Sequence, residues 1–353
     1  MNRFLHPSLL LILLLLFSCV KSQEESINEY IVINPYDTVD WGTVLYVPSC
    51  SHEHGTSQNK LNNLLNLGIK HVAFSNYYPS KPYYPLEDFF YVPDGIIASP
   101  NAEHHSINPF GSFHCNSLGS FYESGSPKGQ NPVGMNGMLW RSAFHEILDR
   151  LQYEDGGGIT INHPSWTRWN SHSPHLSVED ICEMLDYDAR VLGIEIYNGT
   201  CEYSFDEKLG WDLDTWDTVL KTGRRCWGFC VADHRNEVEK MSGFNVLLCN
   251  EYDEHDCLKA YREGRFYGSI HNTSLKFESI SLIDKCLTAS ATDADFLNFV
   301  IDGNYYKIDG GTGSIMIPDN AVYARIEAHN AENSLYSNPI LFRTKSERNH
   351  NTL

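Results

Sequence analysis

The chain has 353 residues, of which 42% are hydrophobic and 12% aromatic, a composition that excludes a disordered protein and provides for a substantial core. Its formal net charge is −19 and it has no basic cluster, so we expect neither a nucleic-acid surface nor an electrostatic membrane surface. A small phosphorylated substrate stays compatible with this acidity, because bound metal ions reverse the local field.

The N-terminal segment 1–18 has the pattern of a signal peptide, with a positive charge before an apolar run that is too short to span a bilayer well. Ser18 directly before Cys19 resembles a bacterial lipoprotein cleavage site. We therefore expect export to the cell envelope, at its periplasmic or outer-membrane face. Cleavage before Cys19 would be followed by lipid attachment and a tether over 19–39, and this anchor would be the protein's membrane contact. Ordinary secretion is the alternative.

Short apolar runs alternate with helical patterns along the next part of the chain. The runs predict buried strands at 42–47, 71–75, 95–99, 158–162, 193–198 and 226–232. The helical patterns lie at 60–68, 137–152, 177–188 and 216–223. This alternation predicts parallel strands in an α/β fold, and six such strands favour a barrel over an open sheet. Neither GxGxxG nor GxxxxGKS occurs, which argues against a nucleotide-binding sheet.

Helical patterning stops near residue 272. Short alternating runs broken by Gly, Pro, Asn and Asp then predict a small antiparallel β domain or extension over 273–345. We expect a barrel over 40–272 before it and a disordered polar tail over 346–353 after it.

Ten cysteines occur in the chain, and nine remain when Cys19 is set aside. They are scattered without CxxC spacing, so neither a zinc knuckle nor a dense disulfide framework is expected.

Histidines and acidic residues stand just after several of the predicted strands. They are His52 and His54, Glu103, His114, His163, and Asp233 with His234. In barrels of alternating strands and helices, the C-terminal strand ends converge on one face, so these side chains can meet in space. Each of them alone is explained as well by a surface cap or a turn. Together they predict a site for zinc, manganese or iron, at which two or three ions share one activated hydroxide.

The stretch His52-Glu53-His54 raises a geometric expectation. Residues i and i+2 of a strand share a face, so both histidines should point into the mouth of the barrel, with Glu53 directed away and dispensable for metal binding. Each histidine should be held at its other ring nitrogen by a carboxylate or carbonyl. The ligand atoms should lie about 3–5 Å apart even without metal.

The order of these motifs resembles the polymerase and histidinol phosphatase (PHP) superfamily: His-x-His, a strand-end Glu, a His, "NHP", and an Asp with a neighbouring His. "LKTGRRCWGFCVADH" is similar to the segment entering that family's last metal motif, and "CLKAYREGRFYGS" to the helix and strand after it. "ARIEAHNAENSLYSNPILF" is similar to a β appendage of secreted members. The resemblance extends over about 40–345.

The resemblance implies a distorted barrel of about seven β/α units and metal-dependent hydrolysis, usually of phosphate esters. It implies that His52, His54 and Asp233 bind a first metal ion and that Glu103 bridges two ions. His114 and His163 would bind the second or third.

Three departures from the family pattern bear on the metal set. Cys50 and Ser51 precede the first histidine, where the family usually has an acid or asparagine. Asn76 and Tyr77 stand where it has Asp-His, which leaves open that one metal site is lost.

The third departure is Asp233-His234-Arg235 in place of Asp-x-His. Either His234 serves as the ligand, with a catalytic role beside Asp233, or Arg235 takes its place and grips a phosphate through its planar fork. We also expect Arg168, in "HPSWTRW", to contact the substrate.

Two functions follow from these patterns. The first is a lipid-anchored hydrolase in which a metal-bound hydroxide attacks a small phosphate ester at a di- or trinuclear site. The second is a PHP-like barrel that has lost part of its metal set and binds a glycan or envelope component without turnover. The aromatic-rich stretch "SNYYPSKPYYPLEDFFY" suits the second function. The retained His52, His54, Glu103, His163 and Asp233 favour the first. A glycosidase is less favoured, since no pair of carboxylates stands out as acid and nucleophile.

Overall fold

The computed structural model describes residues 31–343, apart from 78, 106, 108, 111–112, 125–137, 167–175, 205–206, 235–241 and 272. The expected signal peptide, Cys19, the tail over 346–353, Arg168 and Arg235 lie outside the described residues. None of the helices within the described part is long and apolar enough to cross a bilayer.

A five-stranded sheet carries the middle of the chain, in the order β5-β6-β7-β8-β9. Its strands are β5 (Glu103–His104), β6 (Cys115–Leu118), β7 (Gly158–Ile161), β8 (Val191–Asn198) and β9 (Trp227–Val231). The pairs β7–β8 and β8–β9 are parallel, whereas β5–β6 and β6–β7 are antiparallel. The parallel strands are those that the alternating pattern predicted, and β7 to β9 are buried along their whole length.

An eleven-stranded sheet joins the start of the described chain to its end, along the path β1-β19-β17-β18-β11-β10-β2-β3-β4. Strand β14 pairs with β17 and with β15 beside this path. The strands are β1 (Ile31–Ile33), β2 (Leu45–Cys50), β3 (His71–Val72), β4 (Ile97–Ala98), β10 (Phe244–Cys249), β11 (Phe266–Ser269), β14 (Phe296–Ile301), β15 (Asn304–Asp309), β17 (Tyr323–His329), β18 (Ser334–Ser337) and β19 (Ile340–Arg343). A separate antiparallel sheet holds β12 (Lys276–Ile283), β13 (Cys286–Thr292) and β16 (Thr312–Met316).

The expected α/β class is confirmed, but no closed barrel forms among the described strands. Two features of the strands account for this. β3 and β4 have only two residues each, so little backbone is available for further pairing. Antiparallel pairs β5–β6 and β10–β11 also interrupt the parallel order, and the sequence pattern did not indicate either pair.

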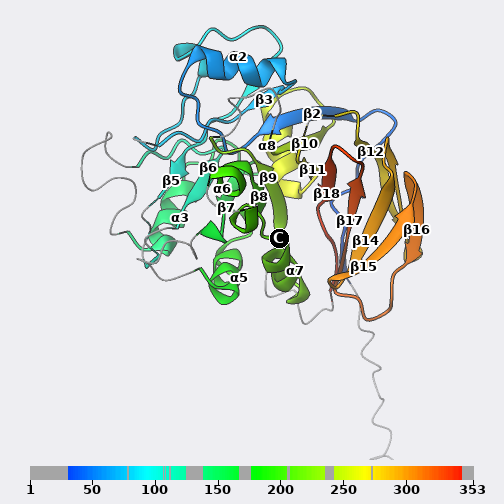
Figure 1. Ribbon diagram of the computed structural model, residues 1–353. Helices are drawn as coiled ribbons and strands as arrows, with labels where there is room; N and C mark the ends of the chain where they lie inside the picture. Colours follow the sequence, from blue (N-terminus) through cyan, green and yellow to red (C-terminus); the bar gives the residue numbers. More distant parts are fainter. Residues whose placement is uncertain are drawn as a thin grey trace, which may run out of the picture.

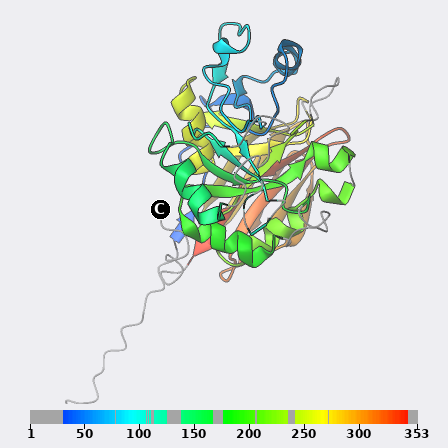
Figure 2. The ribbon, with the colours of Figure 1, turned by 90° about the vertical axis from the view of Figure 1, so that its left-hand side faces the viewer.

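The helices are α2 (Gln58–Asn66), α3 (Trp140–Leu148), α5 (Val178–Tyr187), α6 (Gly199–Ser204), α7 (Leu213–Lys221) and α8 (Glu254–Glu263), with short 3-10 turns η1 (Leu86–Asp88) and η2 (Glu207–Leu209). Helix α5, at one of the predicted helical patterns, begins at a capping box in which Ser177 and Asp180 bond each other's backbone N–H. Helix α2 lies at the top of both ribbon views, away from the C-terminal strands (Figures 1 and 2).

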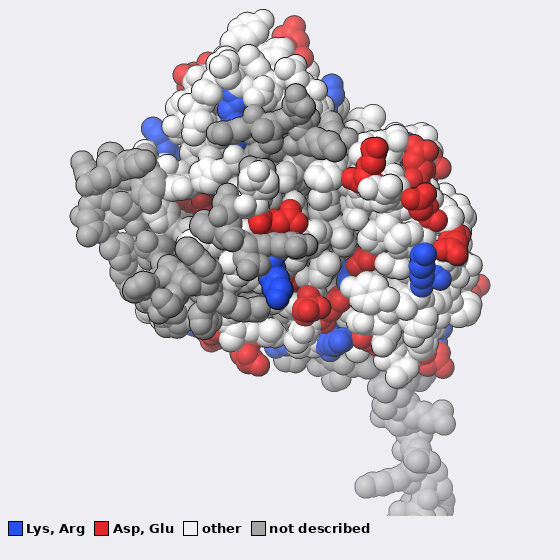
Figure 3. All heavy atoms as spheres, in the orientation of Figure 1, with Lys and Arg blue, Asp and Glu red and all other residues white. Residues whose placement is uncertain are grey.

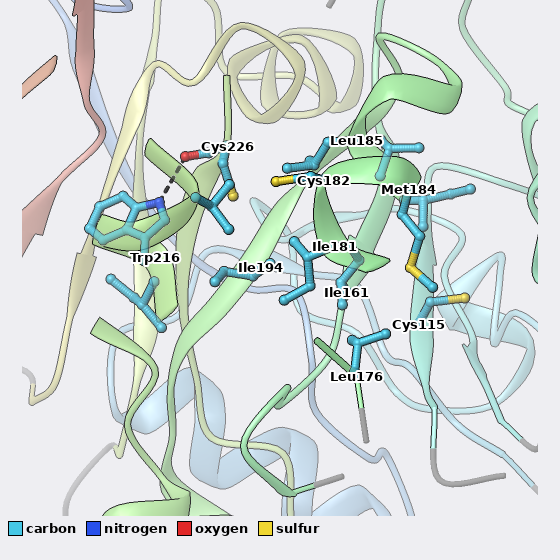
Figure 4. Packing of buried hydrophobic residues seen from close by; sticks show 14 of the residues in the cluster. Cys115, Ile161, Leu176, Ile181, Cys182, Met184, Leu185, Ile194, Trp216 and Cys226 are labelled. Carbon is cyan, nitrogen blue, oxygen red and sulfur yellow. Dashed lines mark hydrogen bonds between the residues drawn. The ribbon is translucent and has the colours of Figure 1, made fainter. Parts of the chain in front are cut away.

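Helices α5 and α7 cover β7, β8 and β9 with a shared apolar core (Figure 4). Ile181 and Leu185 of α5 are fully buried there, as is Ile194 of β8. Trp216 of α7 is buried too, and its indole N–H donates to the carbonyl of Cys226 at 2.8 Å. This packing holds β7 to β9 rigid beneath the loops that follow them.

Five of the strands after residue 272, β14, β15 and β17 to β19, belong to the same sheet as β2, β10 and β11, although the predicted boundary at 272 separates them in sequence. The segment 31–39, expected to be part of a tether, is partly strand: Ile31–Ile33 pairs antiparallel with Ile340–Arg343. Three β-branched residues provide the β propensity for this pairing. Acidic side chains gather over the C-terminal strands on the face shown in Figure 3.

Candidate metal centre

Six of the predicted ligand side chains meet in one cluster. They are His52, His54, Glu103, His114, His163 and Asp233. His52 and His54 follow β2, His163 follows β7 and Asp233 follows β9, so three C-terminal strand ends contribute as expected. Glu103 lies on β5 and His114 immediately precedes β6, which form an antiparallel pair.

A first group of potential ligands consists of His52, His54 and Asp233, all buried. Asp233 Oδ1 lies 3.0 Å from His54 Nε2 and 3.5 Å from His52 Nε2. Among the described residues, none of these three atoms has a hydrogen-bond partner of good geometry. Buried polar atoms are rarely left unsatisfied, so three that face one another fit a site for a cation.

A second group consists of Glu103, His114 and His163. Glu103 Oε1 lies 2.8 Å from His114 Nδ1 and 3.5 Å from His163 Nε2. The same carboxylate also reaches the first group, with Oε1 3.5 Å from His52 Nε2 and Oε2 3.4 Å from His54 Nε2. Glu103 therefore stands between the two groups, where the family resemblance implied a bridging ligand.

The charges in the cluster perturb one another. Burial raises the pKa of Glu103, but His52 and His114 beside it hold that pKa well below its usual range. Burial lowers the pKa of His52, and the carboxylates of Asp233, Glu195 and Glu103 more than offset this, so the pKa is raised well above its usual value. Ionised carboxylates so close together favour a positive charge among them.

The backbone is left-handed at two of the potential ligands, with φ of 28° at His163 and 61° at Asp233. Non-glycine residues seldom adopt positive φ, and such strained positions concentrate at functional sites. At both positions the turn directs a side chain from the end of a strand into the cluster.

Glu195 is a site residue that the sequence reasoning missed. Its Oε1 lies 2.6 Å from His52 Nδ1, and its Oε2 accepts from the His163 backbone N–H at 2.9 Å. Asn198 donates to Glu195 Oε2 at 3.0 Å and to Asp233 Oδ2 at 3.3 Å. A carboxylate at Nδ1 fixes the ring of His52 with Nε2 facing the cluster. The available signal was a single charged residue inside the apolar strand "GIEIYN".

We expect Glu195→Gln to weaken metal binding by about 10–100-fold, because an amide cannot fix the His52 tautomer as a carboxylate does. Titration calorimetry with Zn²⁺ or Mn²⁺ measures the change. Glu183→Gln is the matched control, since Glu183 is half exposed and pairs with Arg141 on the surface. Equal affinities for wild type and Glu195→Gln would rule out this role.

His234 lies at the rim of the cluster rather than in either group. Its side chain is 47% exposed and stacks on His54 with ring centroids 3.9 Å apart. Its Nε2 lies 3.2 Å from the Tyr77 hydroxyl and 3.5 Å from Asp233 Oδ1. Burial lowers the pKa of His234 to about 4. Asn76, which the sequence resemblance aligned with a metal ligand, instead donates to the carbonyl of Gly55 at 3.2 Å.

Glu53 points away from the cluster, as the His-x-His pattern predicted. Its carboxylate is fully buried and lies 2.7 Å from Nζ of Lys60 on α2, and that ammonium also donates to the carbonyl of His234 at 3.1 Å. Burial raises the pKa of Glu53 to about 7, although Lys60 opposes the shift. The pair ties α2 to the loops that follow β2 and β9.

Glu53→Gln is therefore expected to lower stability by about 1–3 kcal/mol, because it removes the charge that compensates the buried ammonium of Lys60. Metal affinity should change little, since the carboxylate faces α2. Urea unfolding beside calorimetric titration separates the two effects. If a Glu53→Gln protein folds but no longer binds metal, the conclusion that Glu53 supports the fold and not the metal site would be wrong.

A cavity of about 120 Å³ opens onto the two groups. Besides Glu103, His114, His163, Asp233 and His234, it is lined by Tyr77, Trp166, Thr200 and Cys201. Trp166 packs against His114 and His163 at centroid distances of 5.1 Å and 5.2 Å. The cavity therefore has polar ligands on its floor and aromatic walls.

Comparisons with known proteins give little further guidance. No family model matches the chain, and no curated protein does. One solved structure, described as a two-domain protein containing a predicted PHP-like metal-dependent phosphoesterase from Bacteroides vulgatus, aligns with 87% of this chain and 96% of its own. The sequence identity is 14% and the TM-score is 0.45.

Proposed function

We propose that this protein is a metal-dependent hydrolase of phosphate esters, of the PHP type, with two divalent ions held between β2, β5, β7 and β9. The observation that carries this proposal is the position of Glu103, whose carboxylate lies within 3.5 Å of ligand atoms from both groups. We further propose a distorted PHP-type barrel whose ring stays open, and an envelope location reached through the N-terminal signal and Cys19.

The donor set fits such ions. Four imidazoles and two carboxylates suit zinc, manganese or iron, whereas magnesium and calcium prefer oxygen ligands alone. The orphaned Nε2 atoms of His52 and His54 and Oδ1 of Asp233 are placed to complete a coordination shell. Bound ions would supply positive charge at the phosphoryl oxygens and lower the pKa of a water molecule.

The chain's own residues position the ligand side chains, line the cavity and move a proton. Glu195 and Asn198 hold His52, His163 and Asp233 in register from one strand. Trp166 and Tyr77 wall the cavity, which strengthens electrostatic interactions inside it.

His234 reaches the rim beside Asp233, where we propose that its neutral imidazole accepts a proton from the attacking water molecule. We propose that Arg168 and Arg235, outside the described residues, grip the phosphate.

A binding protein without turnover is the second candidate. The observation that favours it is Asn76, whose amide bonds Gly55 instead of facing a metal position. In this case the aromatic walls would hold an envelope-derived ligand such as a glycan.

Hydrolysis of p-nitrophenyl phosphate and bis-p-nitrophenyl phosphate, with and without Mn²⁺ or Zn²⁺, tests the proposal. We expect metal-dependent release of nitrophenol that His52→Ala abolishes. A metal-loaded protein that hydrolyses neither ester would support binding without turnover instead.

A further inference from the structure

Two sulfur atoms are in contact where β10 leads into α8, away from the metal centre. Cys249 is the last residue of β10, and Cys257 lies in the second turn of α8. Their Sγ atoms are 3.9 Å apart and both side chains are fully buried, each as a free thiol. Thiols held together in this way can be joined without moving the backbone far.

The corner that brings the two sulfurs together is fixed by charged hydrogen bonds. The carboxylate of Asp256 accepts from the backbone N–H of Asn250 and of Glu251, at 2.5 Å and 3.0 Å. Arg265 lies 2.8 Å from the same carboxylate and donates to the carbonyl of Leu248 at 2.5 Å. Arg265 is only 3% exposed. The end of the strand and the start of the helix are thus clamped on both sides of the cysteine pair.

We propose that Cys249 and Cys257 form a disulfide when the chain folds under oxidising conditions. Bond formation shortens the Sγ–Sγ distance from 3.9 Å to about 2.0 Å, a change within reach of small side-chain torsions. The export expected from the N-terminal sequence would provide such conditions. A single local disulfide also agrees with the scattered cysteines of the sequence, which do not suggest a dense disulfide framework.

The oxidant is a disulfide donor, either a small molecule such as oxidised glutathione or a protein. The thiolate of one cysteine attacks a donor sulfur, forms a mixed disulfide and releases one donor thiol. The thiolate of the second cysteine then displaces the other donor sulfur. Two electrons and two protons end on the two donor thiols, and the chain gains one S–S bond. Because both sulfurs are buried in the folded chain, exchange takes place before this corner closes.

The cross-link would pin α8 to the sheet. Leu258 and Tyr261 of this helix are fully buried in a core with Trp227 and Phe266, so a loosened α8 would expose that core. Closing a loop in the unfolded chain raises stability, modestly for a loop this short. The metal ligands lie on other elements, and their affinity should not respond.

Peptide mapping of the full chain tests the proposal without any substitution. Protein refolded in a glutathione redox buffer is denatured, alkylated without reductant, digested and analysed by mass spectrometry. We expect a linked peptide pair containing Cys249 and Cys257, lighter than the two free peptides by two hydrogens. Complete alkylation of both cysteines, or a link from either one to another cysteine, would overturn the proposal.

Variants add a second readout. Cys286→Ala, at a partly buried cysteine of β13, should keep the linked pair, whereas Cys249→Ala should leave Cys257 alkylated. The urea midpoint of wild type should fall once the protein is unfolded and refolded with reductant. The midpoint of a double Cys249→Ala and Cys257→Ala variant should be the same with and without reductant. Equal midpoints for oxidised and reduced wild type would show that no stabilising bond forms.

Discussion

His52→Ala and His54→Ala are each expected to lower metal affinity and hydrolysis by more than about 100-fold. Loss of a residue that only supports a metal ligand already lowers metal affinity or activity by about 10–100-fold, and these substitutions remove a ligand itself. Both side chains offer an orphaned, buried Nε2 to the same position beside Asp233 Oδ1. Either substitution removes one ligand of the first group and leaves the second group intact. Folding should be affected little, since the loop after β2 keeps its backbone contacts with Asp233.

Metal content by elemental analysis, together with ester hydrolysis, measures this effect. His145→Ala is the matched control, because His145 lies on α3 with its side chain 63% exposed. Wild-type metal content in His52→Ala and His54→Ala would show that the first group does not bind a metal ion. Loss of metal in His145→Ala would indicate an effect of histidine substitution unrelated to the site.

Asp217→Ala is expected to lower the free energy of unfolding by about 3–5 kcal/mol, because it leaves a buried guanidinium without its main partner. Arg325 of β17 is fully buried and bonds Asp217 of α7 through two nitrogens, at 2.8 Å and 3.0 Å. Burial opposes the charge of Arg325, yet Asp217 and Glu327 raise its pKa. The pair joins the helical layer to the C-terminal strands.

Denaturant unfolding with and without the substitution gives the size of this effect. Glu183→Gln provides the contrast, because its ion pair with Arg141 is half exposed and worth no more than about 1 kcal/mol. A double variant with Asp217→Leu and Arg325→Met should be more stable than Asp217→Ala, since it removes the buried guanidinium and leaves only Glu327, which keeps His329 as a partner at 3.0 Å. A loss below about 1 kcal/mol for Asp217→Ala would mean that water reaches the guanidinium.

Sequence periodicity did not predict the short β5 that carries Glu103, but it did predict β2, β7, β8 and β9, because buried parallel strands are continuous apolar runs followed by polar turns. It therefore located His52, His163 and Asp233 at strand ends. It missed β10, although "FNVLLC" is a similar run, since no helical pattern precedes it. Its antiparallel pairing with β2 and β11 depends on contacts distant in sequence, and this pairing breaks the expected barrel order.

The residues that support the potential metal ligands were harder to predict from the sequence. Glu195 became visible as a partner of His52 only when β8 was placed beside the loop after β2. The role of Glu53 shows the same limit. Alternation predicted that it points away, but its buried pairing with Lys60 depends on how α2 packs. His234 directly follows Asp233 in sequence, yet its side chain lies at the rim of the cluster.

Anomalous diffraction from crystals soaked in Zn²⁺ or Mn²⁺ would locate the ions of a two-ion centre. We expect two peaks, one among His52, His54 and Asp233 and one between His114 and His163, with Glu103 in contact with both. A single peak, or peaks away from these side chains, would contradict a two-ion centre bridged by Glu103.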